Sequence, residues 1–416
     1  MMTQGGDFGS HPSGGHHVER TDRPSSQPDR KRRALQFVLL VGVMSFFADF
    51  VYEGARGIAG PFLALLGASG VVVGAAAGLG ELAGYGLRLV SGGLADRTRA
   101  YWPITIAGYV VQMAAVPALA LAGAWPVAAL LLVLERVGKA TRNPPRDVML
   151  SRAGQEMGGY GWAFGLHEAL DQFGALVGPL AMAGILAWRR DYPLAFAALA
   201  IPAACTLMLL SVARIRYPRA VEFESAVEPG PERPQFPRVF WAYLAGAALV
   251  GAGFADFPLI AFHFQQASVL PPTWVPVFYA VAMGVGGAGS LVFGKLFDRT
   301  GLKVLVPLSF VSALYAPLAF FGSRWTAFAG ITLWGLGVGV HESIMAAAIA
   351  TMVPTERRAR AYGLFTAAFG LFWFLGSILL GWLYDVSLPA MVIVAAALEV
   401  AGVPFFIISA RWQART

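Results

Sequence analysis

Long apolar stretches recur from about residue 35 to residue 410 of this chain, and they limit what the chain can fold into. About 20 apolar residues in a row suffice to cross the hydrocarbon core of a membrane. Of the 416 residues, 57% are hydrophobic and only 13% are charged, which is too few to cover a soluble domain with solvated side chains. The expected fold class is therefore an all-α membrane protein that crosses the bilayer many times.

Glycines, prolines and clusters of charge divide the apolar stretches into twelve predicted spans. They are expected at about 35–66, 71–95, 101–123, 126–150, 160–187, 192–213, 238–268, 274–297, 302–321, 325–351, 360–383 and 388–410. The sixth and seventh spans are separated by a charged, proline-broken segment that cannot cross a membrane. We predict four regions, which are a disordered tail at 1–33, a six-helix bundle at 34–213, a linker at 214–237 and a second six-helix bundle at 238–412.

Lysine and arginine residues in the loops, at the termini and at the adjoining ends of the predicted spans are distributed very unevenly. Counted in this way, with Lys139, Arg142 and Arg146 assigned to the loop after the fourth span, 25 lie on one side of the membrane, and only Arg189, Arg190 and Arg324 lie on the other. Loops rich in Lys and Arg stay in the cytoplasm. We therefore expect both termini to be cytoplasmic, with the protein in the inner (plasma) membrane. This topology also accounts for the net charge of +7, so no nucleic-acid partner is expected.

Several classes of site are excluded or disfavoured by what the sequence lacks. A single cysteine, Cys205, excludes a disulfide scaffold and a cysteine-based metal site. The chain contains no Walker loop, nucleophile elbow or metalloprotease motif, and the short predicted loops leave little room for a catalytic domain. We expect no enzyme, no cofactor and no resident metal. The expected partners are the lipid bilayer and a small-molecule substrate, and the expected state is a monomer.

The two halves of the chain echo each other. Three short matches occur in the same order in equivalent spans: Phe47–Phe50 with Phe254–Phe257, Asp96–Thr98 with Asp298–Thr300, and Ala163–Leu166 with Ala361–Leu364. Each match is short, but their order indicates a parallel duplication in which the halves are related by an axis along the membrane normal.

One of these repeated segments resembles a family signature. The segment Gly92–Arg99 is similar to the loop between helices 2 and 3 of the major facilitator superfamily, and Gly294–Gly301 is similar to its copy in the second half. The resemblance covers residues 34–412 and implies two pseudo-symmetric six-helix bundles that transport by alternating access. It also implies a cytoplasmic gate, for which the matching residues are Gly93, Asp96, Arg97, Asp298 and Arg299.

Two further segments resemble motifs of the same family. The segment Glu135–Ala140 is similar to the helix-4 motif associated with proton coupling, with Arg136 at the arginine position. In the fifth span, Gly174, Gly178 and Pro179 resemble the motif that marks exporters, although such glycines also serve close helix packing. His167 and Asp171 lie four residues apart on the same predicted helix and share a face.

Ionisable residues inside predicted spans are the candidate functional residues, because a charge at the bilayer centre costs about 2.5–3.5 kcal/mol on insertion scales. Asp49, Glu53 and Arg56 share one face of the first span, and we expect them to couple protons together with Arg136. The residues expected to line a substrate cavity are Glu81, Arg88, Asp256, His263, His341 and Glu342.

Several functions are compatible with the sequence. The favoured interpretation is a proton-coupled exporter, an antiporter, of an amphipathic organic compound, which suits an aromatic content of 12%. Histidines and carboxylates within the spans also permit a divalent transition-metal exporter. A proton-coupled importer and a non-transporting membrane sensor are compatible with the same residues.

Overall fold

A computed structural model describes residues 27–157, 160–218, 236–353 and 358–413. Within those ranges, the side chains of the candidate site residues Asp96, Asp298, His341 and Glu342 are not described. Most of the predicted tail and linker also lie outside the described residues. The first helix begins at Gln27, so the last seven residues of the predicted tail are helical rather than disordered.

The described residues form α-helices and short 3-10 helices and contain no strand. The elements of the first half are α1 (Gln27–Leu65), α2 (Gly70–Thr98), α3 (Tyr101–Ala118), η1 (Leu119–Leu121), α4 (Trp125–Met157), α5 (Tyr160–Arg189), α6 (Tyr192–Ala198) and α7 (Ala200–Arg216). Those of the second half are α8 (Arg238–Gly253), α9 (Phe257–Gln266), η2 (Pro272–Trp274), α10 (Val275–Thr300), η3 (Gly301–Val304), α11 (Leu305–Ala313), α12 (Tyr315–Phe320), α13 (Arg324–Met352), α14 (Arg358–Val386) and α15 (Leu388–Gln413). Every predicted span coincides with one helix or with consecutive helical segments.

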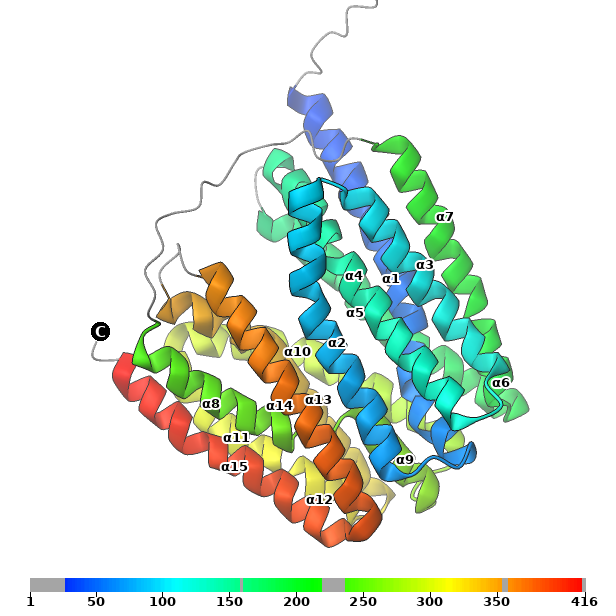
Figure 1. Cartoon of the computed structure of the whole chain (residues 1–416), viewed down its shortest axis with the longest axis vertical. Coiled ribbons are helices and arrows are strands. Elements are labelled where there is room, and N and C mark those ends of the chain that lie inside the picture. The colour runs from blue at the N-terminus through cyan, green and yellow to red at the C-terminus, as the bar shows by residue number, and fades with distance from the viewer. Residues whose placement is uncertain (1–26, 158–159, 219–235, 354–357, 414–416) are drawn as a thin grey trace, which may run out of the picture.

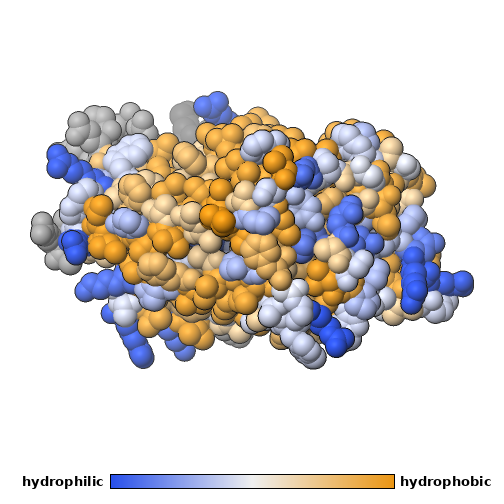
Figure 2. All heavy atoms as spheres, turned by 90° about the horizontal axis from the view of Figure 1, so that it is seen from below, coloured by the Kyte–Doolittle hydropathy of each residue, from blue (hydrophilic) through white to orange (hydrophobic). Residues whose placement is uncertain are grey.

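Ten helical segments of the described chain are long and apolar enough to cross a membrane. The long helices α4 and α13 pack among them, α4 against α2 and α3, and α13 against α10. The count of twelve membrane helices therefore stays a prediction. Figure 2 shows apolar residues over most of one face of the molecule, with strongly hydrophilic residues toward its edges.

The helices form two bundles, α1 to α7 and α8 to α15, which touch through three main helix pairs. These pairs are α2 with α14, α1 with α9, and α5 with α10. Figure 1 shows α2 and α14 side by side at one end and separated toward the other, where α2 ends and α14 begins. We call these the closed end and the open end.

Glycines bring α2 and α14 together at the closed end. A Cβ atom on Gly74 would lie 2.1 Å from the carbonyl oxygen of Ser377, and one on Gly381 would lie 2.4 Å from that of Gly70. The carboxylate of Asp385 accepts hydrogen bonds from the first two amides of α2, those of Gly70 at 2.6 Å and Val71 at 2.8 Å. A carboxylate at a helix N-terminus is favoured by the helix dipole. Asp385 thereby joins the two bundles.

The repeated Phe-Ala-Asp-Phe segment has a different conformation in each half. Phe47–Phe50 lies inside the continuous helix α1, whereas Phe254–Asp256 interrupts the helix between α8 and α9. The second copy is followed by Pro258, which lacks the amide hydrogen that would bond to the Phe254 carbonyl in a continuous helix, and which lies instead in the first turn of α9. At this interruption the backbone of Ala255 forms hydrogen bonds with side chains instead of within a helix. Its amide donates to the Tyr315 hydroxyl at 2.6 Å, and its carbonyl accepts from the Trp334 indole at 2.8 Å.

The glycine contacts generate a first prediction. Gly74→Ala places a methyl group against the backbone of α14, so we expect α2 and α14 to separate at the closed end. Gly84→Ala is the matched control, because a Cβ atom there has nothing within 4 Å. Double electron–electron resonance between spin labels at the exposed Leu65 and Val386, in a Cys205→Ala background, should give a longer distance for Gly74→Ala only. Equal distances in all three proteins would contradict the packing argument.

Candidate functional site

Charged side chains from both bundles converge between the two halves of the molecule. We define the central charged cluster by its acidic and basic members: Asp49, Glu53, Glu81, Glu135, Asp256, Arg56, Arg136, Lys139 and Arg142. These side chains are buried or nearly so, with Lys139 the most exposed of the ion-paired groups at 18%. The cluster combines ions from α1, α2, α4 and the interruption between α8 and α9.

Arg56 links the two bundles within this cluster. Its guanidinium forms a close ion pair with Asp256 of the second bundle and lies 3.5 Å from Glu81 on α2. It also donates a hydrogen bond to the Tyr52 hydroxyl at 3.0 Å. Asp256 additionally accepts from the amide of Phe257 at 2.9 Å, so the same carboxylate caps α9. Removing Arg56 would leave the buried Asp256 carboxylate without its cationic partner, and removing Asp256 would leave Arg56 with Glu81 alone.

The two acids of α1 have different surroundings. Asp49 lies 3.7 Å from Lys139 and 3.6 Å from Arg142, both of which belong to α4 in its own bundle. Glu53 instead accepts a short hydrogen bond from the hydroxyl of Tyr279 on α10. Glu53 therefore contacts the other bundle directly. Arg56 shares a face of α1 with these two acids, but its ion pairs are with Asp256 and Glu81.

The basic residues of α4 reach deep into the first bundle. Arg136 pairs with Glu81 at 2.8 Å, and Arg142 donates to Gln112 at 2.6 Å and to the Tyr109 hydroxyl at 2.9 Å. In the count of basic residues, Lys139, Arg142 and Arg146 were treated as cytoplasmic loop charges. That assignment was wrong, because α4 continues to Met157 and Arg142 and Arg146 are buried inside the bundle.

A polar cavity of about 150 Å³ adjoins the cluster between the bundles. The first bundle contributes charged and polar walls, and the second contributes small and apolar ones. The lining residues are Asp49, Glu53, Lys139, Asp171, Gln172, Ala175, Met283, Gly286, Gly287 and Val338. Because both halves line it, the cavity must change shape whenever the halves move relative to each other.

Other residues predicted to line a substrate cavity lie elsewhere. Arg88 is exposed on α2, with its guanidinium 5.7 Å from the centre of the Tyr85 ring. His263 is buried on α9 with its Nδ1 atom 3.1 Å from the Tyr384 hydroxyl, at the closed end. Glu81 and Asp256 belong to the central charged cluster. The side chains of His341 and Glu342 are not described.

The predicted gate lies at the open end. Gly93 is exposed, and a Cβ atom there would meet nothing within 4 Å. Arg97 and Arg299 are exposed in the last turns of α2 and α10. The carboxylates of Asp96 and Asp298, on which the predicted gate contacts depend, lie outside the described side chains.

The predicted motif of α5 packs against α1. Cβ atoms on Gly174 and Gly178 would lie 2.3 and 2.4 Å from the carbonyl oxygens of Phe46 and Phe50, so glycine is required for this close approach. Pro179 follows within the same helix and lies near Gly57. These contacts support the packing interpretation of the glycines.

His167 lies toward the first bundle's interior. Its Nε2 atom is 2.8 Å from the Ser45 hydroxyl, which in turn accepts from Arg146 at 3.2 Å. Its Nδ1 atom is 3.8 Å from Asp171, a residue that also lines the polar cavity. The predicted pair is therefore close in space and adjoins the cavity.

The family assignment rests on a direct match to known sequences. The family model of the Major Facilitator Superfamily matches residues 41–341, which is well over half of the chain. The chain belongs to this superfamily.

Relatives and solved structures agree with this assignment. An uncharacterized protein of Mycobacterium tuberculosis is 44% identical over 372 residues, which cover 88% of this chain and 91% of the relative. A mutant of the peptide transporter POT, crystallised in complex with alafosfalin, superposes with a TM-score of 0.71 at 14% identity, covering 94% of this chain and 99% of the other. An inward-facing bacterial homolog of the human lysosomal transporter Spinster gives 0.64 at 16% identity, with coverage of 94% and 97%. At these identities the structural similarity shows the fold alone.

Two tyrosines contact the central charged cluster but were not among the residues predicted from the sequence. Tyr52 and Tyr279 are buried aromatic residues within apolar spans, and nothing in their spacing marks them. The Tyr52 ring centre lies 3.6 Å from the Lys139 ammonium and 4.8 Å from the Arg136 guanidinium, which is a favourable cation–π arrangement. Arg142 could have been predicted from the sequence as a member of the cluster, because it lies about one helical turn beyond Lys139 on the same helix.

Metal binding receives no geometric support from the visible side chains. Within the described ranges, no group of three or more His, Cys, Asp or Glu side chains is placed to hold a metal ion. His167 and His263, for example, belong to separate bundles and contact hydroxyl groups of Ser45 and Tyr384.

The Arg56–Asp256 ion pair generates the second prediction. Asp256→Asn keeps the size of the side chain and its ability to cap α9, but it leaves Arg56 facing a neutral group. Breaking a buried pair in this way costs about 3–5 kcal/mol, so we expect a large fall in the thermal unfolding temperature. The double variant Arg56→Gln/Asp256→Asn should recover part of that loss.

Asp191→Asn is the matched control for this substitution. Asp191 also caps a helix, accepting from Leu194 at 3.0 Å, but it is exposed and asparagine caps equally well. Thermal unfolding in detergent should therefore barely change for Asp191→Asn. A similar loss in both single variants would show that the ion pair adds nothing beyond the helix cap.

Proposed function

We propose that this secondary transporter is a proton-coupled exporter of a small amphipathic organic compound. Its membership of the major facilitator superfamily supports transport through a path between the two bundles. The polar cavity supports the choice of substrate, because carboxylates and an ammonium line one side while Met283, Val338 and two glycines line the other. A compound with one charged and one apolar side matches both walls.

The size of the cavity bears on how this substrate enters. Pockets that enclose drug-sized ligands have volumes of roughly 300–1,000 Å³. The cavity between the bundles has about 150 Å³, so a substrate of that size requires the bundles to part further at the open end. We propose that the bundles 34–213 and 238–412 are the units that move, joined by the linker 214–237.

Proton coupling is assigned to the acids of α1, with Glu53 ahead of Asp49. Asp49 shares a face of α1 with Glu53, but the ion-pair partners of Asp49, Lys139 and Arg142, belong to its own bundle. The contact of Glu53 with Tyr279 crosses between bundles and must change when they separate. Proton coupling requires a titratable group whose surroundings differ between the inward-open and outward-open states of the transporter. Arg136 and Arg56 then hold the neighbouring carboxylates Glu81 and Asp256 in place.

The two ends of the molecule would serve as alternating gates. At the closed end, opening must break the contacts of Asp385 with the α2 amides and the glycine packing beside them. At the open end, we propose that closure uses the signature loop, with Asp96 bracing α2 against the N-terminal end of α14. The favourable interaction of a carboxylate with a helix N-terminus applies at both gates.

The proposed exporter lies in the inner membrane as a monomer, with both termini and the tail 1–33 cytoplasmic. This orientation generates the third prediction. Single cysteines at Ser225, in the linker, and Ser268, after α9, should react with a membrane-impermeant maleimide from opposite sides of sealed, oriented vesicles, in a Cys205→Ala background. Labelling of both positions from the same side would overturn the topology.

The coupling assignment generates the fourth prediction. Glu53→Gln keeps the side chain's size and removes its titratable charge. We expect the distance between spin labels at Thr98 and Thr300, the exposed open-end residues of α2 and α10, to change with pH in the wild type. In Glu53→Gln the distance should no longer depend on pH.

Glu135→Gln is the control for this experiment. Glu135 is a buried cluster carboxylate whose partners, Gln112 and Arg136, both belong to the first bundle. Its replacement should leave the pH response in place. If Glu53→Gln and Asp49→Asn both respond to pH as the wild type does, the coupling site lies elsewhere, and His167 with Asp171 is the next pair to test.

Substrate and direction require a separate experiment. Purified protein should be screened by thermal shift against lipophilic cations, organic acids and divalent metals. The compound that stabilises the protein most is then followed in sealed vesicles with and without an imposed pH gradient. Export coupled to protons predicts that an organic amphipath moves against the proton flow. Stabilisation by metals alone, or flux that ignores the gradient, would overturn the proposal.

A further inference from the structure

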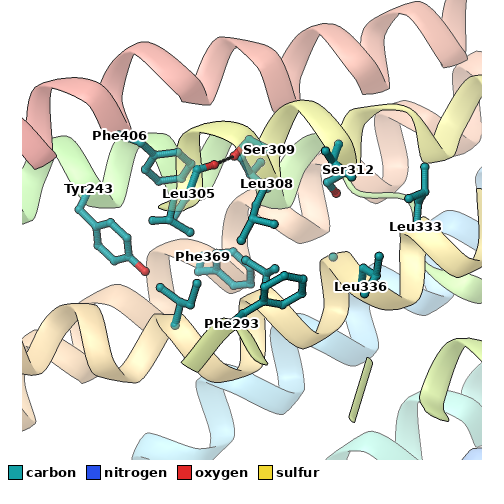
Figure 3. Close-up of a pocket in the computed structure, with 16 residues that line it drawn as sticks. Tyr243, Phe293, Leu305, Leu308, Ser309, Ser312, Leu333, Leu336, Phe369 and Phe406 are labelled. Atoms are coloured by element: carbon teal, nitrogen blue, oxygen red, sulfur yellow. Dashed lines mark hydrogen bonds between the residues drawn. The ribbon is translucent and has the colours of Figure 1, made fainter. Parts of the chain in front are cut away.

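The second bundle encloses a cavity that is separate from the transport site. Its volume is about 270 Å³, and it lies among α8, α10, α11, α13, α14 and α15. Figure 3 shows aromatic and aliphatic side chains around it, including Tyr243, Phe293, Phe369 and Phe406. The wall is almost entirely carbon. Among its polar groups, the Ser309 hydroxyl is already occupied, because it donates to the Leu305 carbonyl at 2.8 Å.

The equivalent region of the first bundle is filled with side chains. Ser309 and Ser312 follow Tyr109 and Gln112 by 200 residues. A Cβ atom on Gly337 would lie 2.9 Å from the Ser312 hydroxyl, just as one on Gly138 would lie 2.8 Å from the Gln112 Cβ atom. In the first bundle, the tyrosine and the glutamine are buried and hydrogen-bonded to Arg142. Serines at the matching positions leave space.

Water is a poor occupant for such a space. A cavity of about 150 Å³ lined by aliphatic and aromatic groups stays dry and takes up apolar molecules instead. Protein interiors otherwise pack closely, so an empty void of this size forfeits many contacts. The chemistry of the wall therefore favours an apolar ligand.

The edge of the cavity indicates where such a ligand comes from. Val311 lines the cavity and is 40% exposed on α11. Phe310 and Leu314 beside it are also exposed, and the segment Gly301–Phe320 is apolar enough to cross a membrane. An exposed apolar side chain within a span faces hydrocarbon, so the space beside Val311 adjoins lipid tails.

We propose that this cavity binds the acyl chain of a membrane lipid, which enters beside Val311 from the bilayer. The ligand is the hydrocarbon chain, held by the apolar walls, while the polar headgroup stays outside. The proposal is independent of proton coupling and of the transported substrate, because the cavity belongs to the second bundle alone.

Photolabelling tests this site. Full-length protein is reconstituted in phosphatidylcholine that carries a diazirine near the end of one acyl chain, irradiated, and mapped by peptide mass spectrometry. We expect adducts on Tyr243, Phe369 and Phe406, which are at most 3% exposed and cannot be reached from the outer surface. Adducts confined to exposed residues such as Phe310 and Leu314 would overturn the proposal.

Ser309→Phe fills the cavity and should abolish the adducts on the buried residues. Ser211→Phe is the matched control, because Ser211 lies exposed on α7 and its hydroxyl also bonds to the carbonyl four residues earlier, at 2.8 Å. Labelling of the buried residues should persist in that variant. Undiminished labelling in folded Ser309→Phe would contradict the site. If Ser309→Phe does not fold, the wild-type labelling pattern decides the matter by itself.

Discussion

The ion pair between Arg56 and Asp256 is the contact on which the arrangement of the two bundles depends. A guanidinium at this depth is tolerated only if carboxylates compensate it, and the compensation here comes from both bundles, through Asp256 and Glu81. The position of Asp256 depends in turn on the interruption between α8 and α9, which Pro258 favours and which Tyr315 and Trp334 stabilise by hydrogen bonds. The break in the helix of the second bundle thus positions the Asp256 carboxylate that compensates Arg56 of the first bundle.

The duplicated halves have specialised differently around the same helix plan. The first bundle has an interior of hydrogen-bonded ions and amides, in which Arg142, Gln112 and Tyr109 satisfy one another. Such a network fixes geometry, because each buried polar group is costly when its partner is lost. At matching places the second bundle has Ser309 and Ser312 beside a carbon-lined space. Eight of the nine members of the central charged cluster thus belong to the first bundle, and the second bundle contributes only Asp256.

Most of the helices could be predicted from the sequence, because apolar stretches and the glycines and prolines that bound them depend only on neighbouring residues. Positions of individual charges were harder. Arg142 and Arg146 lie within the predicted fourth span, which ends near residue 150, but they were counted with the loop that follows it. In the structure they are buried in α4, which continues to Met157. Arg56 and Asp256 were both recognised as charges within spans, but their pairing joins residues 200 positions apart and no local spacing reveals it. Pro258 was a usable and missed signal for the interruption before α9.

The near-balance of charge in the cluster has a consequence for electrical behaviour. The cluster contains five acids and four bases, so when all are ionised it carries one net negative charge. A charge that crosses the whole membrane exchanges about 2.3 kcal/mol with a potential of about 100 mV. Rocking of the bundles therefore displaces little net charge through the field. In the proposed proton-coupled cycle, the membrane voltage would act mainly on the protons that are carried, and the rearrangement of the protein itself would move little net charge.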